Sequence, residues 1–480
     1  MTDEYVEQLV YEHELMFYPY APIGVLHNQG RWPFPKYRYS LVACARWETR
    51  YIAEWLNYHR QLGVDHVYLY CNDDDPTELY REILPFLEGD QPFVTFYHFG
   101  FVGLQTQMYF HFLRNHSHET QWYMALDIDE FLCIKDANSL PEFMKRFPRD
   151  MDVVYFNWLL YGHNNFEKRP DGDVLSQYTR REPYVGVFTK IMVKTRSFPY
   201  CEFFNNHEAP IMHTLEGVNP KLKMRTVLNE EVTDYYNNFP DSAWNYMKAD
   251  DRWIKMLSVA YIAHFTMKSK EDYDLRAKRS AVGVFVTQKS WAAMSDEARA
   301  EHGRLTNREE DYFLRDYWKK YLSYAWDYSI LPPTRWPLIS EGKPANQSST
   351  NQKCSTRKAA GFLVSGRLYA IAQSQTEPQH DPWWEIDLQD TYRIHEVRLF
   401  NRLDTTLNLM SNFVIKSSED NAFWIARHEK KDEMVFGGAD GSPYCWVNTE
   451  GFQARWIRIE LPGARRVLCL DQVQIFGERM

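Results

Sequence analysis

Two aspartates separated by one residue stand directly after an apolar run of the sequence. Asp127 and Asp129 follow residues 122–126, and the apolar pattern resumes at Phe131 and Leu132. An Asp-x-Asp pair alone also occurs in surface loops, but apolar residues on both sides place this one at the end of a buried strand. Carboxylate oxygens are the ligands that hard cations such as Mn²⁺ or Mg²⁺ prefer, and such a cation can neutralise a diphosphate leaving group. The pattern therefore predicts a metal and diphosphate site.

The segments around these aspartates alternate between strand-like and helix-like patterns. Buried strands are expected at 39–45, 67–70 and 122–126, and helices at 49–62, 104–115, 251–263, 270–281 and 307–324. This alternation predicts an α/β domain of Rossmann-like type with a mostly parallel sheet. Ligands of such sheets bind beyond the carboxyl ends of the strands. The polar run from Asn72 to Pro76 follows one strand and the Asp-x-Asp pair another, so both should lie at one edge.

Length and composition limit the class of protein. The chain has 480 residues, which is enough for two domains that each bury a core. A formal net charge of −10 argues against the clustered basic footprint of a nucleic-acid-binding protein. The seven cysteines include no Cys-x-x-Cys pair of the kind that binds zinc. Aromatic residues make up 16%, which suits carbohydrate binding, although a large aromatic core gives the same figure.

The chain start and the hydropathy pattern bear on location. Residues 1–20 are acidic and lack the basic and apolar parts of a secretory signal. No run of about 18 apolar residues is present that would predict a membrane-spanning helix. We therefore expect a cytoplasmic protein with no transmembrane segment, for which peripheral association with a membrane stays open.

Prolines and a change of pattern divide the chain into parts. Prolines cluster between 330 and 344, which is typical of a stiff linker. Short alternating strands follow at 383–388, 394–401, 412–417, 455–461 and 473–476, as in an antiparallel sandwich. We expect an N-terminal extension at 1–36, an α/β domain at 37–329, a linker at 330–343 and an all-β jelly-roll sandwich at 344–480.

Several ordered motifs in the first domain carry a resemblance to a known family. The stretches LVACARWETRYIAEWLNYHRQLGVDHVYLYCNDDDP, QTQMYFHFL, WYMALDIDEFL and YIAHFTMKSKEDYDLRAKRSAVG resemble glycosyltransferase family 92, which is similar to family 2 enzymes of GT-A fold. The resemblance implies a metal-dependent hexosyltransferase that uses Mn²⁺ or Mg²⁺. It would move galactose or glucose from a UDP-linked sugar to a glycan or lipid-linked glycan, with inversion, in surface polysaccharide or glycoconjugate synthesis.

The resemblance also implies roles for particular residues. Asp129, Asp127 and His264 would bind the metal, although without the family resemblance a core histidine is the preferred interpretation of His264. Asp127 and residues near it would also bind the donor. The implied donor-binding residues are Arg46, Glu48, Asn72, Asp73, Gln105, Asp127, Lys190 and Lys268.

An inverting transfer needs a general base that takes the proton of the acceptor hydroxyl. Asp250 and Asp251 lie between the Asp-x-Asp pair and His264 in the chain, where several GT-A enzymes have an acidic base. Capping of the next helix is an equally good role for them. Glu208 and Glu202, beside His207 in an irregular segment, are the rival bases.

The second domain carries its own resemblance. The pieces PANQSST, DPWWEIDL, FNRLDTTLNLMSNFVIKSS and LDQVQIFGE resemble the discoidin and F-type lectin family of jelly-roll sandwiches. Arg402 and Asp404 match the Arg-x-Asp of that family's fucose site, which implies a glycan site there. Gln375 and Leu409 stand where the family has further sugar-binding residues, and Ser365 where it has a calcium ligand, so neither fucose nor calcium is implied.

Two other functions fit parts of the sequence. A metal-dependent phosphohydrolase also uses an Asp-x-Asp pair, but it needs a Thr or Val shortly after the second Asp, where this chain has Glu130 and Phe131. A lectin-like protein with an inactive first domain is the other alternative. Release of UDP from a nucleotide sugar separates the transferase from both.

Overall fold

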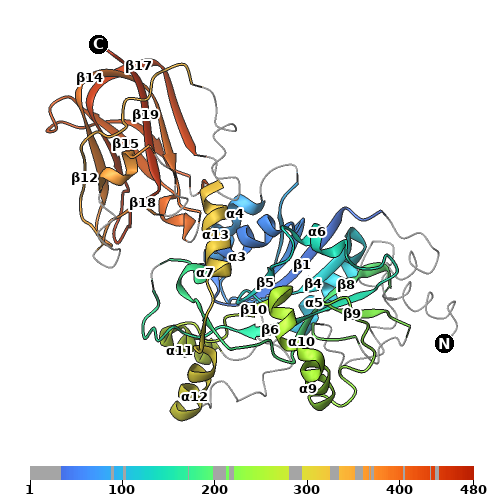
Figure 1. Cartoon of the computed structure of the whole chain (residues 1–480). Helices are drawn as coiled ribbons and strands as arrows, with labels where there is room; N and C mark the ends of the chain where they lie inside the picture. Colours follow the sequence, from blue (N-terminus) through green and yellow to red (C-terminus); the bar gives the residue numbers. More distant parts are fainter. Residues whose placement is uncertain are drawn as a thin grey trace.

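The computed structural model describes residues 34–480 apart from short gaps at 88–90, 101–103, 171, 198–211, 216–220, 280–294, 325–333, 352–359, 367, 369–371, 404–405, 433 and 438–442. It contains an α/β domain and a β-sandwich (Figure 1). No helix of the described ranges has the length and apolar character that crossing a membrane requires.

A mixed nine-stranded sheet forms the centre of the α/β domain, in the order β3-β2-β1-β4-β8-β6-β10-β5 with β9 beside β6. Strands β1 to β4 are parallel to one another, whereas β8 and β5 run antiparallel to their neighbours. The strands are β1 (Tyr37–Ala45), β2 (His66–Cys71), β3 (Val94–His98), β4 (Thr120–Ala125), β5 (Glu130–Ile134), β6 (Val153–Leu160), β8 (Thr189–Lys194), β9 (Met224–Thr226) and β10 (Ala260–His264). The short strands β7 (Arg180–Arg181) and β11 (Glu309–Glu310) pair separately.

Helices cover this sheet and connect its strands. They are α3 (Thr49–Leu62), α4 (Thr77–Leu87), α5 (Gln105–Asn115), α6 (Leu140–Met144), α7 (Val174–Gln177), α9 (Asp241–Lys248), α10 (Arg252–Lys255), α11 (Lys270–Arg279), α12 (Asp296–Thr306) and α13 (Phe313–Tyr324). The prediction for α3 agrees residue by residue. Gly63 ends α3 in the left-handed conformation at φ 100°, and a Cβ there would lie 2.6 Å from the ring of Pro141, so only glycine fits.

The predicted helix at 251–263 is wrong in its second half. The chain forms the short helix α10 and then the strand β10, which lies between β6 and β5. Every residue of β10 is buried. A short run that is apolar on both faces shows no periodicity that separates strand from helix, and its place inside the sheet decides the outcome.

The second domain is an antiparallel sandwich, as predicted. Its main sheet has the order β12-β14-β17-β15-β16 with β19 beside β14, and β13 pairs with β18. The predicted strands at 383–388 and 394–401 are one long, bulged strand, β14. The strands are β12 (Ala345–Gln347), β13 (Ser374–Gln375), β14 (Trp383–Phe400), β15 (Phe413–Ser418), β16 (Ile425–Lys430), β17 (Tyr444–Glu460), β18 (Cys469–Leu470) and β19 (Gln472–Arg479). Trp384 is fully buried in its core.

Direct contacts join the two domains along α3 and α4 (Figure 1). Glu82 of α4 is 1% exposed and accepts hydrogen bonds from the backbone N–H groups of Leu407, at 2.9 Å, and Asn408, at 3.4 Å. Ala53 of α3 packs with Leu407 and Val435 in a small buried cluster. The sandwich is therefore anchored to the α/β domain by a buried carboxylate and an apolar contact.

We expect Glu82→Ala to weaken this anchor. Loss of the carboxylate leaves two buried backbone N–H groups without their acceptor, which should lower the free energy of unfolding by about 2 kcal/mol. Urea denaturation followed by fluorescence measures the change. Glu78→Ala, on the exposed face of the same helix, is the matched control and should change stability little. Equal stability of the two variants would contradict the role of Glu82.

Candidate functional site

The predicted site residues follow the carboxyl ends of strands that run in one direction. Arg46 and Glu48 come after β1, Asn72 and Asp73 after β2, Asp127 and Asp129 after β4, and His264 closes β10. Strands β1, β2 and β4 are parallel, and β10 has the same direction because β6 lies parallel to it and two antiparallel steps separate β6 from β4. The expectation that both acidic clusters lie at one sheet edge is confirmed.

The loops after β1 and β2 hold each other in place. The backbone N–H of Trp47 donates to Asp73 Oδ1 at 2.6 Å, and the Arg46 guanidinium donates to the backbone carbonyl of Asn72. Asn72 Nδ2 donates in turn to the carbonyl of Phe99 at 2.6 Å. Burial raises the pKa of Asp73. Three of the predicted donor-binding residues, Arg46, Asn72 and Asp73, therefore form one connected loop surface.

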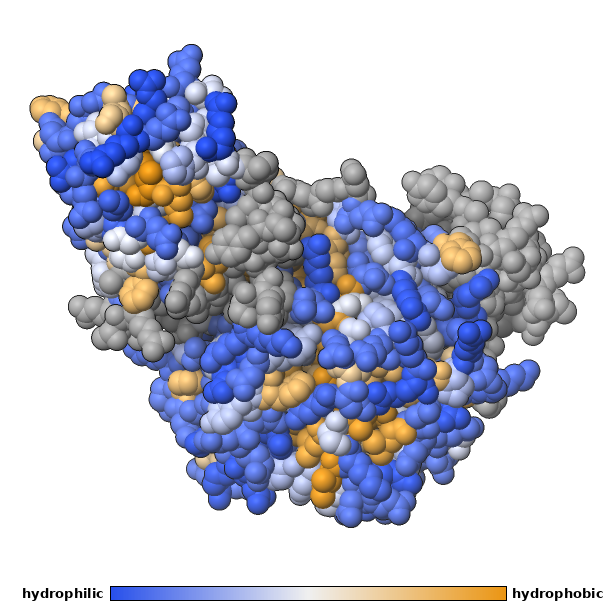
Figure 2. Space-filling model, turned by 45° about the horizontal axis from the view of Figure 1, so that its top comes forward, coloured by the Kyte–Doolittle hydropathy of each residue, from blue (hydrophilic) through white to orange (hydrophobic). Residues whose placement is uncertain are grey.

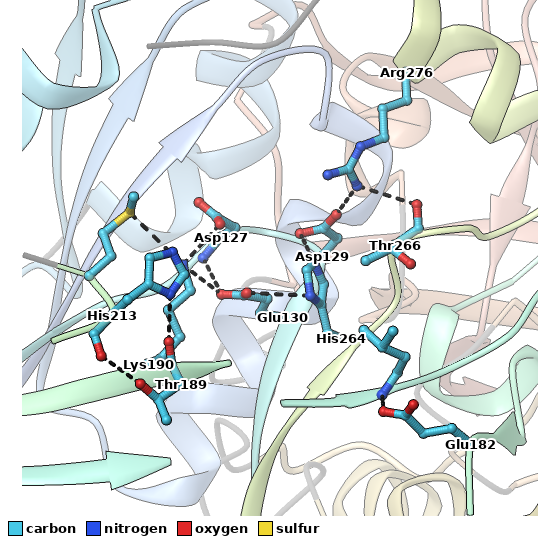
Figure 3. Close-up of polar contacts among 12 residues, drawn as sticks. Asp127, Asp129, Glu130, Glu182, Thr189, Lys190, His213, His264, Thr266 and Arg276 are labelled. Carbon is cyan, nitrogen blue, oxygen red and sulfur yellow. Dashed lines mark hydrogen bonds and ion pairs between the residues drawn. The ribbon is translucent and has the colours of Figure 1, made fainter. Parts of the chain in front are cut away.

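A buried lysine neutralises the first aspartate of the pair (Figure 3). Lys190 Nζ, from β8, lies 3.0 Å from Asp127 Oδ2 and 3.1 Å from Glu130 Oε2, and Gln105 Nε2 donates to Asp127 Oδ1 at 3.2 Å. Burial alone would lower the pKa of Lys190, but the two carboxylates outweigh it and hold the pKa above its usual value. The predicted residues Gln105, Asp127 and Lys190 thus form one charged group.

The second aspartate lies between a histidine and an arginine (Figure 3). Asp129 Oδ1 is 3.6 Å from His264 Nε2, and Asp129 Oδ2 is 2.5 Å from Arg276 Nη1 of α11. Burial alone would raise the pKa of Asp129, but Arg276 and His264 hold it well below its usual value. The predicted meeting of Asp129 and His264 is therefore present, together with a cation that the sequence pattern did not indicate.

The geometry fits two ligands of one divalent cation. Two ligand atoms that each lie about 2.1 Å from a cation are about 3.0 Å apart at right angles and about 4.2 Å apart when opposite. The 3.6 Å between Asp129 Oδ1 and His264 Nε2 falls in this range. Asp127 faces Lys190, and in the described part of the chain no set of three His, Cys, Asp or Glu side chains gathers as metal ligands. Substrate phosphate oxygens complete many Mg²⁺ sites that have one or two carboxylates.

Glu130 is a further buried acid behind this pair. Its Oε1 lies 3.7 Å from His264 Nδ1, and neither atom has a hydrogen-bond partner among the described residues. Burial raises the pKa of Glu130 to about 7 despite the nearby Lys190. In many metal sites a carboxylate contacts the imidazole nitrogen that does not bind the metal, and this contact orients the ring. Glu130 follows the Asp-x-Asp pair directly, but nothing in the sequence placed its side chain beside His264.

A cationic pocket opens next to Asp129. Its positive side chains come from three segments, and Arg169 is held by Asp272 at 2.7 Å, with Tyr51 OH donating to the same carboxylate at 2.8 Å. A neighbouring cavity of about 270 Å³ shares the wall residue Lys268 with it. The pocket is lined by Trp47, Glu48, Arg50, Tyr51, Arg169, Thr266, Lys268, Asp272, Leu275 and Arg276. Four cations against two carboxylates favour a ligand with several negative charges.

The predicted bases are not part of this cluster. Asp250 and Asp251 are exposed in the turn before α10, and Asp250 pairs with Arg252 at 3.1 Å. Within the described ranges neither carboxylate contacts Asp127, Asp129 or His264. Glu202, His207 and Glu208 lie outside the described residues, so their predicted role stays a prediction.

A partly buried acid that the sequence pattern did not indicate lies near His264. Glu182 Oε1 accepts from the backbone N–H of Leu160 at 2.8 Å, and Leu160 is the sheet partner of His264 (Figure 3). Burial raises the pKa of Glu182 to about 7. Glu182 could not be predicted from the sequence, because it lies in an irregular segment. Its contact with Leu160 forms only because this segment folds back along β6.

The predicted glycan site of the sandwich lies at the junction of the domains. Arg402 is buried, and its Nη1 lies 3.6 Å from Cys469 Sγ. The next residue, Leu403, packs into the core of the α/β domain and accepts a hydrogen bond from Asn57 Nδ2 at 3.1 Å. Asp404 lies outside the described residues. A glycan bound through Arg402 would therefore compete for space with the junction.

Comparisons with known proteins agree with this division. Residues 42–255 match Glycosyltransferase family 92, and residues 364–438 match the NedA-like, galactose-binding domain. A family 92 glycosyltransferase of Oryza sativa subsp. japonica is 25% identical over 24% of this chain and 21% of its own length. The Xenopus laevis pentraxin fusion protein is 22% identical over 29% of this chain and 33% of its own length. The chain thus spans a fifth to a third of these relatives.

Solved structures of lectin modules are similar to part of the chain. The lectin domain of lectinolysin complexed with Lewis B antigen is 28% identical, with a TM-score of 0.25, and covers 30% of this chain and 96% of that chain. An F-lectin (fucolectin) from Morone saxatilis serum is 21% identical, with a TM-score of 0.28, and covers 30% of this chain and 50% of that chain.

The raised pKa of Glu182 predicts a pH dependence of stability. A carboxyl whose pKa rises from 4.5 to about 7 on folding favours the fold while it is protonated, so this stability is present below pH 4.5 and is lost as the pH rises through about 7. Glu182→Gln, which keeps an acceptor for the Leu160 N–H, should therefore be more stable than the wild type by roughly 2 kcal/mol above pH 7. Urea unfolding at pH 5 and pH 8 measures it, and a difference that does not grow with pH would contradict the burial of this acid.

Proposed function

We propose that the chain transfers a hexose from a nucleotide sugar to a glycan, and the match of residues 42–255 to Glycosyltransferase family 92 supports this proposal. The donor is UDP-linked galactose or glucose, and the acceptor is a glycan or a lipid-linked glycan. The observation that carries the proposal is the meeting of Asp129 and His264, 3.6 Å apart, beside a pocket with four cations. The cytoplasmic location and any peripheral membrane association stay predictions.

Different residues of the site would bind the diphosphate, the nucleoside and the metal. The pocket cations Arg50, Lys268 and Arg276 would bind the diphosphate, because charge-assisted hydrogen bonds to phosphate are the strongest kind in such a site. The loop of Asn72 and Asp73, which are 0% and 6% exposed, is the proposed nucleoside-binding segment. Asp129 Oδ1 and His264 Nε2 would hold Mn²⁺ or Mg²⁺, and the metal when bound would add positive charge beside the departing diphosphate.

The transfer is a displacement at the anomeric carbon. The acceptor hydroxyl oxygen forms a bond to that carbon, the bond to the diphosphate oxygen breaks with inversion, and the hydroxyl proton passes to a general base. Glu208 is one base proposed from the sequence; Asp250 and Asp251, also proposed, are exposed and make no described contact with the Asp129–His264 pair. The buried charges that surround Asp127 and Asp129 keep the site electrostatically fixed before substrates arrive, which favours stabilisation of charge that develops in the reaction.

A carbohydrate-binding role of the sandwich is a second proposal. The match of residues 364–438 to the NedA-like, galactose-binding domain supports it. Glycan binding without UDP release would leave the lectin-like alternative, and release of free phosphate without UDP would favour a phosphohydrolase. These outcomes separate the three functions that the sequence leaves open.

We expect Asp129→Asn to reduce UDP release from UDP-galactose or UDP-glucose by about two to three orders of magnitude, because it removes the charge that pairs with His264 and Arg276. A coupled UDP assay with and without Mn²⁺ measures the rate. Asp316→Asn, at an exposed aspartate of α13, is the matched control. Wild-type activity in Asp129→Asn would rule out the assigned site.

Lys268→Ala should weaken donor binding specifically. Lys268 is buried in the wall of the cationic pocket, and its ammonium lies 4.8 Å from the ring centre of Tyr51. Removal of one phosphate contact should raise the KM for the nucleotide sugar about tenfold. Thermal stabilisation of the protein by UDP and Mn²⁺ should fall in parallel, because that stabilisation depends on affinity. A variant with unchanged stabilisation would place the diphosphate elsewhere.

A further inference from the structure

A row of aromatic side chains leads from His264 toward the surface of the α/β domain. Trp158 contacts His264, with ring centres 4.5 Å apart, and Phe188 at 5.4 Å; Phe188 contacts Phe239 at 5.1 Å, and Phe239 stacks on Tyr236 at 4.8 Å. We call Trp158, Phe188, Phe239 and Tyr236 the aromatic row. Its members come from β6, from the segment before β8 and from the segment before α9.

The backbone fixes the inner half of the aromatic row. The N–H of Trp158 donates to the carbonyl of Phe188 at 2.8 Å, and the N–H of Gly186 donates to the carbonyl of Trp158 at 2.7 Å. The segment before β8 therefore runs along β6 and presents Phe188 beside Trp158. This pairing makes the two rings a preformed surface and not a chance contact of mobile side chains.

The aromatic row is incompletely buried. Phe188 is 49% exposed, and Trp158, Phe239 and Tyr236 are all partly exposed. Apolar side chains also gather on the surface of the α/β domain in the space-filling view (Figure 2). A contiguous apolar surface beside polar groups is a feature of ligand-binding sites.

The surroundings of the aromatic row favour a sugar over a lipid. Its inner end meets polar and charged groups, since Trp158 also contacts His213 at 5.3 Å, and His213 Nδ1 lies 2.6 Å from the carbonyl of Thr189. Glu182 holds the neighbouring backbone of Leu160. A pyranose has flat C–H faces for the rings and hydroxyls for the polar groups, whereas an acyl chain needs an apolar channel throughout.

The proposed donor pocket and the aromatic row contact different residues of the Asp129–His264 pair. Arg276 and the cationic pocket contact Asp129, whereas the aromatic row contacts His264, and the close-up shows Arg276 and His264 on different sides of the Asp129 carboxylate (Figure 3). A ligand on the aromatic row would therefore not displace a diphosphate from the pocket, because the row and the pocket share no residue.

From these contacts we propose that the aromatic row is the acceptor subsite and that it binds a pyranose ring of a neutral glycan, with the reacting hydroxyl directed to the Asp129–His264 pair. The inference rests on the proposed function, because an acceptor exists only if the chain is a transferase. Phe188 is a specificity-determining residue in this arrangement, and its ring supplies the outer stacking surface.

The test compares Phe188→Ala with Phe188→Tyr in the full chain. The probes are lactose, N-acetyllactosamine, cellobiose and maltose, with sorbitol as a polyol that has hydroxyls but no ring face. Tryptophan fluorescence titration measures binding, and UDP release from UDP-galactose and UDP-glucose without acceptor measures donor use. Phe423→Ala, at an exposed phenylalanine of the sandwich, is the matched control for the loss of an exposed aromatic ring.

We expect at least one disaccharide to bind the wild type, and its Kd to rise about tenfold in Phe188→Ala, but not in Phe188→Tyr or Phe423→Ala. Thermal stabilisation of the protein by UDP and Mn²⁺ should be the same in Phe188→Ala as in the wild type, because the donor pocket is unchanged. Absence of disaccharide binding, equal binding of sorbitol, or a Kd unaffected by Phe188→Ala would overturn the acceptor subsite. Phe188-dependent binding with no UDP release by the wild type would overturn the transferase and leave only a sugar-binding site.

Discussion

Several charged side chains are buried at the carboxyl edge of the sheet, and each of them requires a partner of opposite charge. Asp129, Glu130 and Lys190 are almost completely shielded from water, and an unpaired charge in such a place would cost several kcal/mol. Lys190 therefore bridges Asp127 and Glu130, while Arg276 and His264 face Asp129. The strands β4, β8 and β10 and the helix α11 must all be placed correctly for these pairs to form, so assembly of the fold and assembly of the site are one event.

The same pairing sets what the site can bind. The site therefore offers a ligand two charged regions: the acidic group around Asp127, whose side chain is 31% exposed although it pairs with Lys190, and the pocket cations beside the buried Asp129–His264 pair. A nucleotide diphosphate with a divalent cation complements both. An aromatic surface beside His264 complements the uncharged partner of such a reaction.

The sandwich is part of this construction and not a loosely tethered addition. Asn57 binds the backbone of Leu403, and Glu82 binds the backbone of Leu407 and Asn408, close to Arg402, which the sequence resemblance placed in a glycan site. A segment cannot be both the closed interface of two domains and an open sugar site without a change in the contacts of Arg402 and Leu403. The junction holds α3, whose first turn lies beside the cationic pocket, against the sandwich.

Short-range sequence pattern by itself determined much of this protein. The span of α3, the strand before Asp127, the antiparallel character of the second domain and the placing of Asn72 and Asp129 at one edge all follow from local periodicity and strand direction. Tertiary structure alone decided that Ala260–His264 is a strand, that Arg276 and Glu130 belong to the site, and that Trp158, Phe188 and Phe239 line up. Those outcomes depend on contacts between residues far apart in the chain, where packing and the pairing of buried charge prevail over local preference.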